Sequence, residues 1–223
     1  MTKLVLLDVD GTLIDSNDAH ADAWIEALEE FGYRVTFARI RTLIGKGGDK
    51  LLPEAVQLDG DRGRVKVIAE RRSQLFMQKY LPKLKPFPAA RELLEHLLAR
   101  GFRLVVATSA RKDEMLGLLR VAGIDDLIDD AASARDAQNS KPDPDIIQAA
   151  LRRAGCRPEE AIMVGDTPYD VQAAIGAHVN LVALLCGGWT VAELSGAIAI
   201  YDDPANLLRW YDDSPLSVKA FAD

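Results

Sequence analysis

Short apolar runs with the length of buried β-strands recur along the chain and limit the folds open to it. Amphipathic segments, such as residues 89–100 and 146–154, separate most of these runs. That alternation is what the crossover connections of a parallel sheet require, and continuous apolar runs are typical of strands covered on both faces. The sequence therefore predicts an α/β fold with a parallel sheet. Its expected strands are residues 4–7, 102–107, 161–164, 181–185 and 197–200.

Residues 16–84 interrupt this alternation, because they carry helical patterns and no convincing strand. Apolar side chains recur at helical spacing in residues 21–31, and again in residues 65–80, where a longer amphipathic helix is expected. The prolines of residues 82–88 then favour an extended connector. We therefore expect two domains, an α/β core made of residues 1–15 and 84–223 and an inserted helical domain at residues 16–83.

The composition narrows the classes of partner. The chain has 223 residues and a formal net charge of -7, which disfavours nucleic acid or an anionic membrane as the main partner. Its apolar runs are too short to span a membrane. Its two cysteines, Cys156 and Cys186, lack the spacing of a zinc site or a disulfide framework. We expect a cytoplasmic monomer or homodimer in which any anionic substrate meets a metal ion, a lysine or a helix N-terminus.

Two of the expected strands are followed by pairs of acidic residues. Asp8 and Asp10 follow the first strand, and Asp166 and Asp170 follow a later one. Ligands bind at the carboxyl ends of strands in parallel sheets of this kind. Two carboxylates about 4 Å apart repel by about 4 kcal/mol at an effective dielectric constant of about 20, so an oxygen-preferring cation such as Mg²⁺ would stabilise them. Taken singly, each pair could also be a solvated turn or a helix cap.

Hydroxyl groups and a lysine stand at similar positions. Thr108 and Ser109 end the second apolar run, where hydroxyls and free backbone N–H groups can bind a phosphate. Lys141 precedes a helix that we expect Asp143 to cap and Pro144 to begin. Alone these signals are weak, because Ser and Thr commonly cap helices and most lysines are surface residues. Their order and spacing together are more specific.

The four polar segments, in this order, resemble the signature of the haloacid dehalogenase superfamily, in its phosphatase branch. The resemblance covers essentially the whole chain and extends to relatives of phosphoglycolate phosphatase and β-phosphoglucomutase. It implies a Rossmann-like parallel sheet, with the helical insert as a cap domain that closes over the site. It also implies an enzyme, a phosphoric monoester hydrolase acting on a small phosphorylated metabolite.

The resemblance assigns roles to residues of the core. Asp8 would be the nucleophile that forms an aspartyl-phosphate, and Asp10 the general acid and then the general base. Thr108 and the N–H of Ser109 would bind the transferring phosphoryl group, and Lys141 would neutralise charge on it.

The metal ligands and the cap residues follow from the same resemblance. Mg²⁺ would be held by Asp8, by the main-chain carbonyl of Asp10, by Asp166 and, directly or through water, by Asp170. In the cap, the glycine-rich loop around Lys46 either points that lysine at the substrate or is an ordinary turn between helices. His20 and Trp24 are expected to be structural.

Other activities of the superfamily fit the residues less well. Asp10 disfavours a dehalogenase or a phosphonate-cleaving enzyme, since both lack an acid at that position. A sugar-phosphate mutase is the main alternative, although mutases often carry Glu where this chain has Gly165. A signalling or binding module phosphorylated on aspartate is a non-enzymatic alternative, disfavoured by the length of the chain. The sequence does not indicate which phosphate ester is the substrate.

Overall fold

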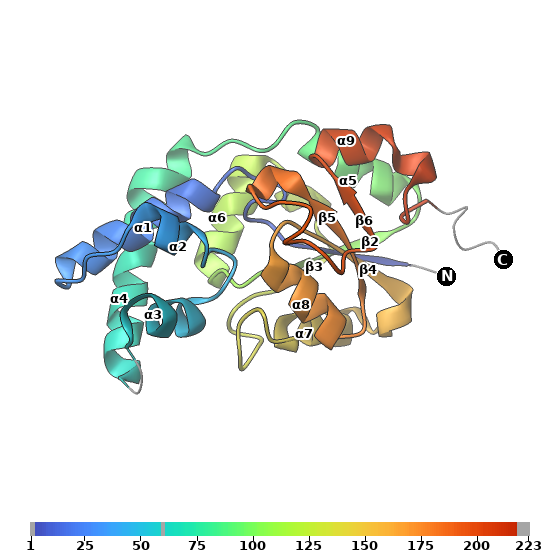
Figure 1. The fold of residues 1–223 in the computed structure, drawn as a ribbon. Helices are drawn as coiled ribbons and strands as arrows, with labels where there is room; N and C mark the ends of the chain where they lie inside the picture. Colours follow the sequence, from blue (N-terminus) through green and yellow to red (C-terminus); the bar gives the residue numbers. More distant parts are fainter. Residues whose placement is uncertain (1–2, 59–60, 218–223) are drawn as a thin grey trace.

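The computed structural model describes residues 3–58 and 61–217, and its centre is a parallel sheet (Figure 1). The strand order is β3-β2-β1-β4-β5-β6, and every neighbouring pair is parallel. The first strand lies in the middle, with Leu6 opposite Val105 on one side and Met163 on the other. The predicted α/β class is confirmed. The strands are β1 (Leu4–Leu7), β2 (Arg103–Ala107), β3 (Asp130–Ala132), β4 (Ala161–Gly165), β5 (Asn180–Leu184) and β6 (Ala199–Tyr201).

Helices cover both faces of the sheet. On one face lie α5 (Ala90–Ala99), α6 (Lys112–Ala122) and α9 (Pro204–Arg209), and on the other lie α7 (Asp145–Ala154) and α8 (Pro168–Gly176) (Figure 1). Successive side chains of β1 alternate between the two layers, with Val5 and Leu7 in one apolar cluster and Leu4 and Leu6 in the other. Burial on both faces explains why the strand reads as an unbroken apolar run.

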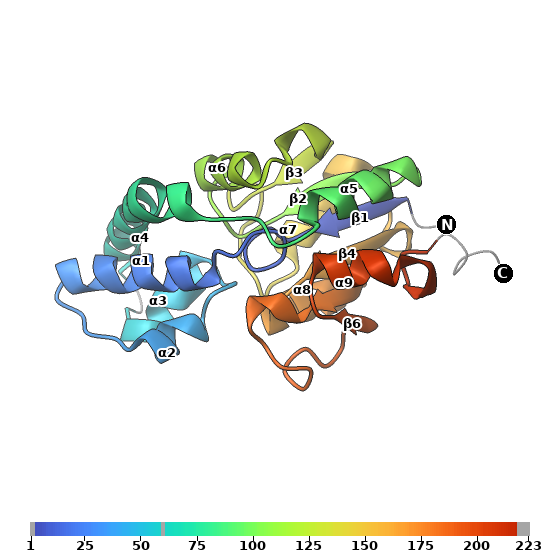
Figure 2. The ribbon, with the colours of Figure 1, turned by 90° about the horizontal axis from the view of Figure 1, so that it is seen from above.

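Between β1 and α5, the described residues form helices and no strand of the sheet. They are α1 (Asn17–Glu30), α2 (Phe37–Arg41), α3 (Gly48–Val56) and α4 (Arg62–Leu75), which continues into a π-helical turn, Phe76–Tyr80, and a 3₁₀ turn, Leu81–Lys83. These helices enclose an apolar cluster of their own, which includes Trp24, Leu28 and Leu52. The carboxyl end of β1 points toward them (Figure 2). The exact division at residues 15/16 and 83/84 stays a prediction.

The local expectations hold with three exceptions. The connector expected to be extended over residues 82–88 begins with the 3₁₀ turn Leu81–Lys83. The strand β3 was not predicted, because its sequence, Asp-Ala-Ala, is short and has no large apolar side chain. Helix α7 begins at Asp145 with Pro144 as its N-cap, so the prediction that Asp143 caps the helix is wrong. Asp143 instead pairs with Lys50, its Oδ2 lying 2.6 Å from the ammonium. The end of α7 is as predicted, with Gly155 in the left-handed region at φ 62°.

Four further 3₁₀ turns of the described residues lie in the connections between the named helices and strands and after α9. They are Asp125–Leu127, Pro158–Glu160, Leu185–Gly187 and Tyr211–Asp213. Within the described ranges, no helix combines the length and the apolar composition needed to cross a membrane.

The central position of β1 leads to a stability prediction. Leu6 is fully buried beneath α7 and α8, so Leu6→Ala should lower the free energy of unfolding by about 2–5 kcal/mol, as lost burial and a residual cavity add. Chemical denaturation monitored by circular dichroism measures this. The matched change Leu116→Ala, at a side chain 37% exposed on α6, should cost less than about 1 kcal/mol. Equal effects of the two changes would contradict the packing described.

Candidate active site

The candidate active site lies where the central strands end. Leu7 is in register with Val106 of β2 and Val164 of β4. Asp8, Thr108 and Asp166 follow these three strands, so all three reach the same edge of the sheet. Each is at least 94% buried, with exposures of 6%, 2% and 0%. The edge therefore brings together one side chain from each of three polar segments.

Lys141 brings in the remaining polar segment. Its side chain is 1% exposed, and its ammonium lies 2.6 Å from Asp8 Oδ1 and 2.7 Å from Asp170 Oδ1. Burial alone would lower the pKa of Lys141, but the carboxylates of Asp170 and Asp8 raise it above its ordinary value. The lysine therefore stays an ammonium ion and binds both acids.

A single lysine does not balance the buried acids around it. Burial raises the pKa of Asp8 well above its ordinary value, the Lys141 charge opposes this, and the other acids raise it further. Burial, followed by the charge of Asp170, raises the pKa of Asp166 to about 7. Asp8, Asp166 and Asp170 each offer an oxygen within 4.8 Å of the others. This excess of buried carboxylates at close range fits a divalent cation with oxygen ligands.

Hydrogen bonds orient these carboxylates. Asp166 accepts from the Thr12 hydroxyl and from the Asn17 side-chain amide, each at 2.9 Å. Asp170 Oδ2 accepts hydrogen bonds from the backbone N–H and the hydroxyl of Thr167, at 3.0 and 2.7 Å. These bonds form the N-terminal cap of α8. The other oxygen, Oδ1, faces Lys141. Asp170 therefore holds Lys141 in place. It is also one of the three acids whose oxygens lie close enough together to hold a metal ion, directly or through water.

The segment after β2 forms the wall of a small chamber. The chamber has a volume of about 60 Å³ and is also lined by Asp8, Asp10 and the cap loop at residues 44–48. The Thr108 oxygen accepts from the Ala110 N–H at 3.0 Å, and the buried Ser109 hydroxyl has no hydrogen-bond partner among the described residues. An unsatisfied hydroxyl beside Asp8 is suited to a bound anion.

Asp10 also lines the chamber. Its hydrogen-bond partners are Ser16, which directly precedes α1, and His20 of α1. Its Oδ1 lies 2.6 Å from the Ser16 hydroxyl and 2.7 Å from His20 Nε2. Burial alone would raise the pKa of Asp10, but the imidazole of His20, together with the Ser16 hydrogen bond, holds it below its ordinary value. The two acids of the first segment therefore have opposite shifts in pKa, which is how two carboxylates acquire different roles.

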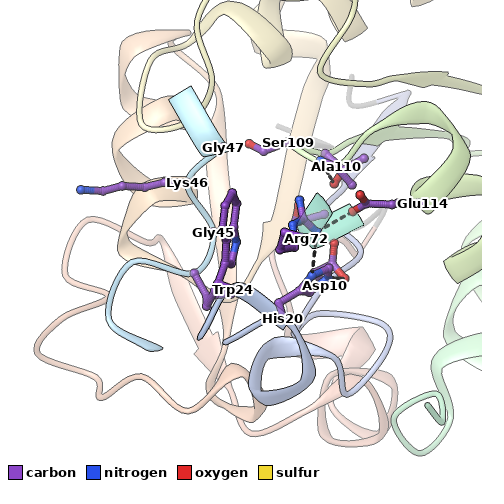
Figure 3. A pocket seen from close by; sticks show the side chains of 14 residues that line it. Asp10, His20, Trp24, Gly45, Lys46, Gly47, Arg72, Ser109, Ala110 and Glu114 are labelled. Carbon is purple, nitrogen blue, oxygen red and sulfur yellow. Dashed lines mark hydrogen bonds and ion pairs between the residues drawn. The ribbon is translucent and has the colours of Figure 1, made fainter. Parts of the chain in front are cut away.

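Arg72 of the helical insert and Glu114 of the core form a buried ion pair next to His20 (Figure 3). Arg72 of α4 donates to Glu114 Oε2 of α6 at 2.8 Å, and its guanidinium lies 4.8 Å from the centre of the Trp24 ring. The same Arg72 nitrogen lies 3.3 Å from His20 Nδ1. These contacts connect Asp10, through His20, to the ion pair between α4 and α6.

Comparison with known proteins agrees with this geometry. A family model described as haloacid dehalogenase-like hydrolase matches residues 5–184. The chain belongs to the haloacid dehalogenase-like hydrolase family. It is 33% identical over 221 residues to a phosphoglycolate phosphatase of Rhodospirillum rubrum, with 94% of this chain and 91% of the relative covered. It is 34% identical over 187 residues to another of Nitrosospira multiformis, covering 81% and 82% of the two chains.

A solved structure resembles the chain closely. The crystal structure of a hydrolase from Pseudomonas syringae superposes with a TM-score of 0.88 at 30% identity, covering 95% of this chain and 99% of that one. A structure described as a putative β-phosphoglucomutase from Bacteroides vulgatus has a TM-score of 0.83 at 23% identity, with 95% and 88% covered. At that identity the second likeness concerns the fold alone. The recognition of the haloacid dehalogenase-like family from the four segments is confirmed.

The cap loop differs from the arrangement predicted for a substrate-binding lysine. Lys46 belongs to the chamber lining, but its ammonium pairs with Glu54 and lies 4.7 Å from the centre of the Tyr169 ring. Figure 3 shows the side chain directed away from Asp10. A contact between Lys46 and substrate stays a prediction, and it would require the side chain to leave Glu54.

Four residues of this site were not predicted from the sequence to have a role in it: Asn17, His20, Arg72 and Glu114. His20 was expected to be structural, and Asn17 was not singled out, yet both reach carboxylates of the site. Their spacing of three residues at the start of a helix was an available signal, because it places them on one face. Arg72 and Glu114 had no local signal, since their pairing depends on how α4 and α6 meet.

The raised pKa of Asp166 has a measurable consequence for the metal-free protein. The folded state holds the proton up to about pH 7, whereas an unfolded Asp releases it near about pH 4. Between these values the folded state binds more protons, so its free energy of unfolding should fall as the pH rises from about 4.5 to 7.5. Urea denaturation of EDTA-treated protein at a series of pH values measures the slope.

Asp166→Asn should reduce that slope and leave the part that Asp8 contributes, because the Asn side chain binds no proton at this position. The matched change Asp125→Asn, at an exposed carboxyl, should leave it unchanged. The same slope in wild-type and Asp166→Asn proteins would show that Asp166 has an ordinary pKa.

Proposed function

We propose that this protein is a phosphatase that hydrolyses a small phosphate monoester through an aspartyl-phosphate on Asp8, with Mg²⁺ as its cofactor. The observation that carries this proposal is the Lys141 ammonium, 2.6 Å from Asp8 at the carboxyl end of the sheet. The ammonium lowers the pKa of Asp8 against the effect of burial and of the neighbouring acids, and a bound Mg²⁺ would complete the charge balance that an anionic nucleophile needs. Membership of the haloacid dehalogenase-like hydrolase family and the names of the phosphatase relatives support the same activity.

In the first step, a carboxylate oxygen of Asp8 attacks the phosphorus, and the bond from phosphorus to the ester oxygen breaks. Asp10 gives its proton to that oxygen, so the product leaves as an alcohol. The low pKa of Asp10 leaves it ionised in the resting enzyme. An anionic phosphate ester placed beside it raises this pKa and favours the protonated acid that the step needs.

In the second step, water attacks the phosphorus of the aspartyl-phosphate. Asp10 takes the proton from the water, the bond between phosphorus and Asp8 breaks, and inorganic phosphate is released. The His20 and Ser16 hydrogen bonds keep the Asp10 carboxylate oriented for this role. Thr108, Ser109 and Lys141 would bind the phosphoryl oxygens in both steps.

The cofactor would lie among the buried acids. Asp8, Asp166 and the main-chain carbonyl of Asp10 would hold Mg²⁺, with Asp170 directly or through water. When bound, the ion would neutralise charge on the phosphoryl oxygens. Thr12 and Asn17 keep both oxygens of Asp166 in place for it.

The substrate would be a small phosphorylated metabolite, and relatives are named for one such ester, phosphoglycolate. The chamber at Asp8 is narrow, and an adjoining cavity of about 260 Å³ shares Arg72, Thr108 and Ser109 with it. Together they accommodate a compact ester. A cytoplasmic location and a monomeric or homodimeric state remain part of the proposal.

Asp8→Asn tests the nucleophile. The amide lacks the charge needed to attack phosphorus, so release of inorganic phosphate from a panel of small esters with Mg²⁺ should fall by at least about 1,000-fold. EDTA should abolish release by the wild type, and added Mg²⁺ should restore it. Asp125→Asn, an exposed residue, is the matched control and should retain full activity.

The outcome also separates the alternatives. Full activity of Asp8→Asn would contradict the nucleophile assignment. Transfer of the phosphoryl group to a sugar hydroxyl without net release of phosphate would favour a mutase. A long-lived phosphoprotein with no turnover, which loses its label when Asp8 is replaced, would favour a signalling role.

A further inference from the structure

Next to Asp10, the Arg72–Glu114 pair leaves two polar atoms without partners. Arg72 Nε and Glu114 Oε1 are both buried and make no hydrogen bond to any described residue. Their side chains are deep in the protein, with residue exposures of 8% and 0%, and both line the chamber. Figure 3 shows Arg72, Glu114 and Asp10 directed toward one another. Buried polar atoms are normally hydrogen-bonded, so this pair indicates a place for ligand atoms.

The two atoms differ in hydrogen-bonding character. Arg72 Nε can only donate, and the ionised Glu114 Oε1 can only accept. A hydroxyl group both donates and accepts, so it can satisfy the two atoms together. A carboxylate can only accept, and it would be repelled by Glu114 at short range.

The charges around the chamber favour the same ligand. Arg72 is already neutralised by Glu114, and Lys46, also in the lining, is paired with Glu54. Lys141 is committed to Asp8 and Asp170. Within the described lining, the side of the chamber near Asp10 therefore presents no unpaired cation to a second anionic group.

The position of the Arg72–Glu114 pair beside Asp10 indicates that it contacts the leaving group of the ester. Asp10 protonates the ester oxygen in the proposed reaction, so a pair that lies beside Asp10, where α4 meets α6, is placed to contact the departing alcohol. We propose that the substrate is a hydroxylated phosphate ester, of the polyol or sugar type, whose hydroxyl next to the ester binds Glu114 Oε1 and Arg72 Nε, and that Glu114 selects against carboxylated esters. This inference rests on the proposed phosphatase function.

Three esters of matched size test the assignment: ethyl phosphate, 2-hydroxyethyl phosphate and 2-phosphoglycolate. They differ only in a terminal methyl, hydroxymethyl or carboxylate group. With Mg²⁺, the wild type should show its highest kcat/KM for 2-hydroxyethyl phosphate. Glu114→Gln should lower the ratio of kcat/KM for 2-hydroxyethyl phosphate over 2-phosphoglycolate by at least about tenfold, because it removes a charged acceptor and a repulsion together.

Two further variants guard against a merely structural effect. Glu92→Gln, at an exposed residue of α5 outside the chamber lining, is the matched control and should keep the wild-type ratio. The double variant Arg72→Gln/Glu114→Gln leaves no buried charge unpaired, so it keeps the test informative if Glu114→Gln is poorly folded. It should bring the kcat/KM values for ethyl and 2-hydroxyethyl phosphate close together. Loss of folding would lower all three activities alike and leave the ratios unchanged.

The results separate the two proposals. A wild-type preference for 2-phosphoglycolate would overturn the hydroxyl assignment while leaving the phosphatase intact. So would an unchanged ratio in Glu114→Gln and in the double variant when circular dichroism shows both to be folded as the wild type is. No release of phosphate from any ester by the wild type, under conditions where the protein is folded and supplied with Mg²⁺, would overturn the phosphatase proposal and this inference with it.

Discussion

The ammonium of Lys141, held between Asp8 and Asp170, is the interaction on which the rest of the site depends. A buried lysine is stable as a cation only when carboxylates surround it, and a buried Asp8 keeps its charge only beside a cation. The contact therefore holds Lys141 as a cation and opposes the rise in the pKa of Asp8 that burial causes. It also ties the loop before α7 to the end of β1 and to the first turn of α8, so three distant segments of the chain are held in one geometry.

The helical insert completes the site as well as covering it. Asn17 and His20, from the first turn of α1, bind Asp166 and Asp10 respectively, and Arg72 of α4 joins Glu114 of the core. A shift of these helices relative to the sheet would therefore change the surroundings of two carboxylates and break a buried ion pair. Cap position and the state of the acids are coupled through these contacts.

Burial and partners divide the acids into different roles. Asp8 and Asp166, packed among other carboxylates, have raised pKa values, while Asp10, beside His20 and Ser16, has a lowered one. The same side-chain type thus has different ionisation behaviour at neighbouring positions, which is what the proposed roles of nucleophile, metal ligand and acid/base require. The Arg72–Glu114 pair adds a neutral, hydrogen-bonding wall to this chamber, which bears on the choice of substrate.

The sequence alone determined the α/β class and the residues at the strand ends. Asp8, Thr108 and Asp166 each directly follow an apolar run, and the carboxyl ends of parallel strands lie at one edge of the sheet. Only the tertiary structure decided what faces them. The partners Arg72 and Glu114 lie 42 residues apart and meet only when α4 docks on α6. Such pairing depends on how helices pack, which no local pattern records. Lys46, for which the sequence left a contact with substrate open, is instead paired with Glu54 of the following helix.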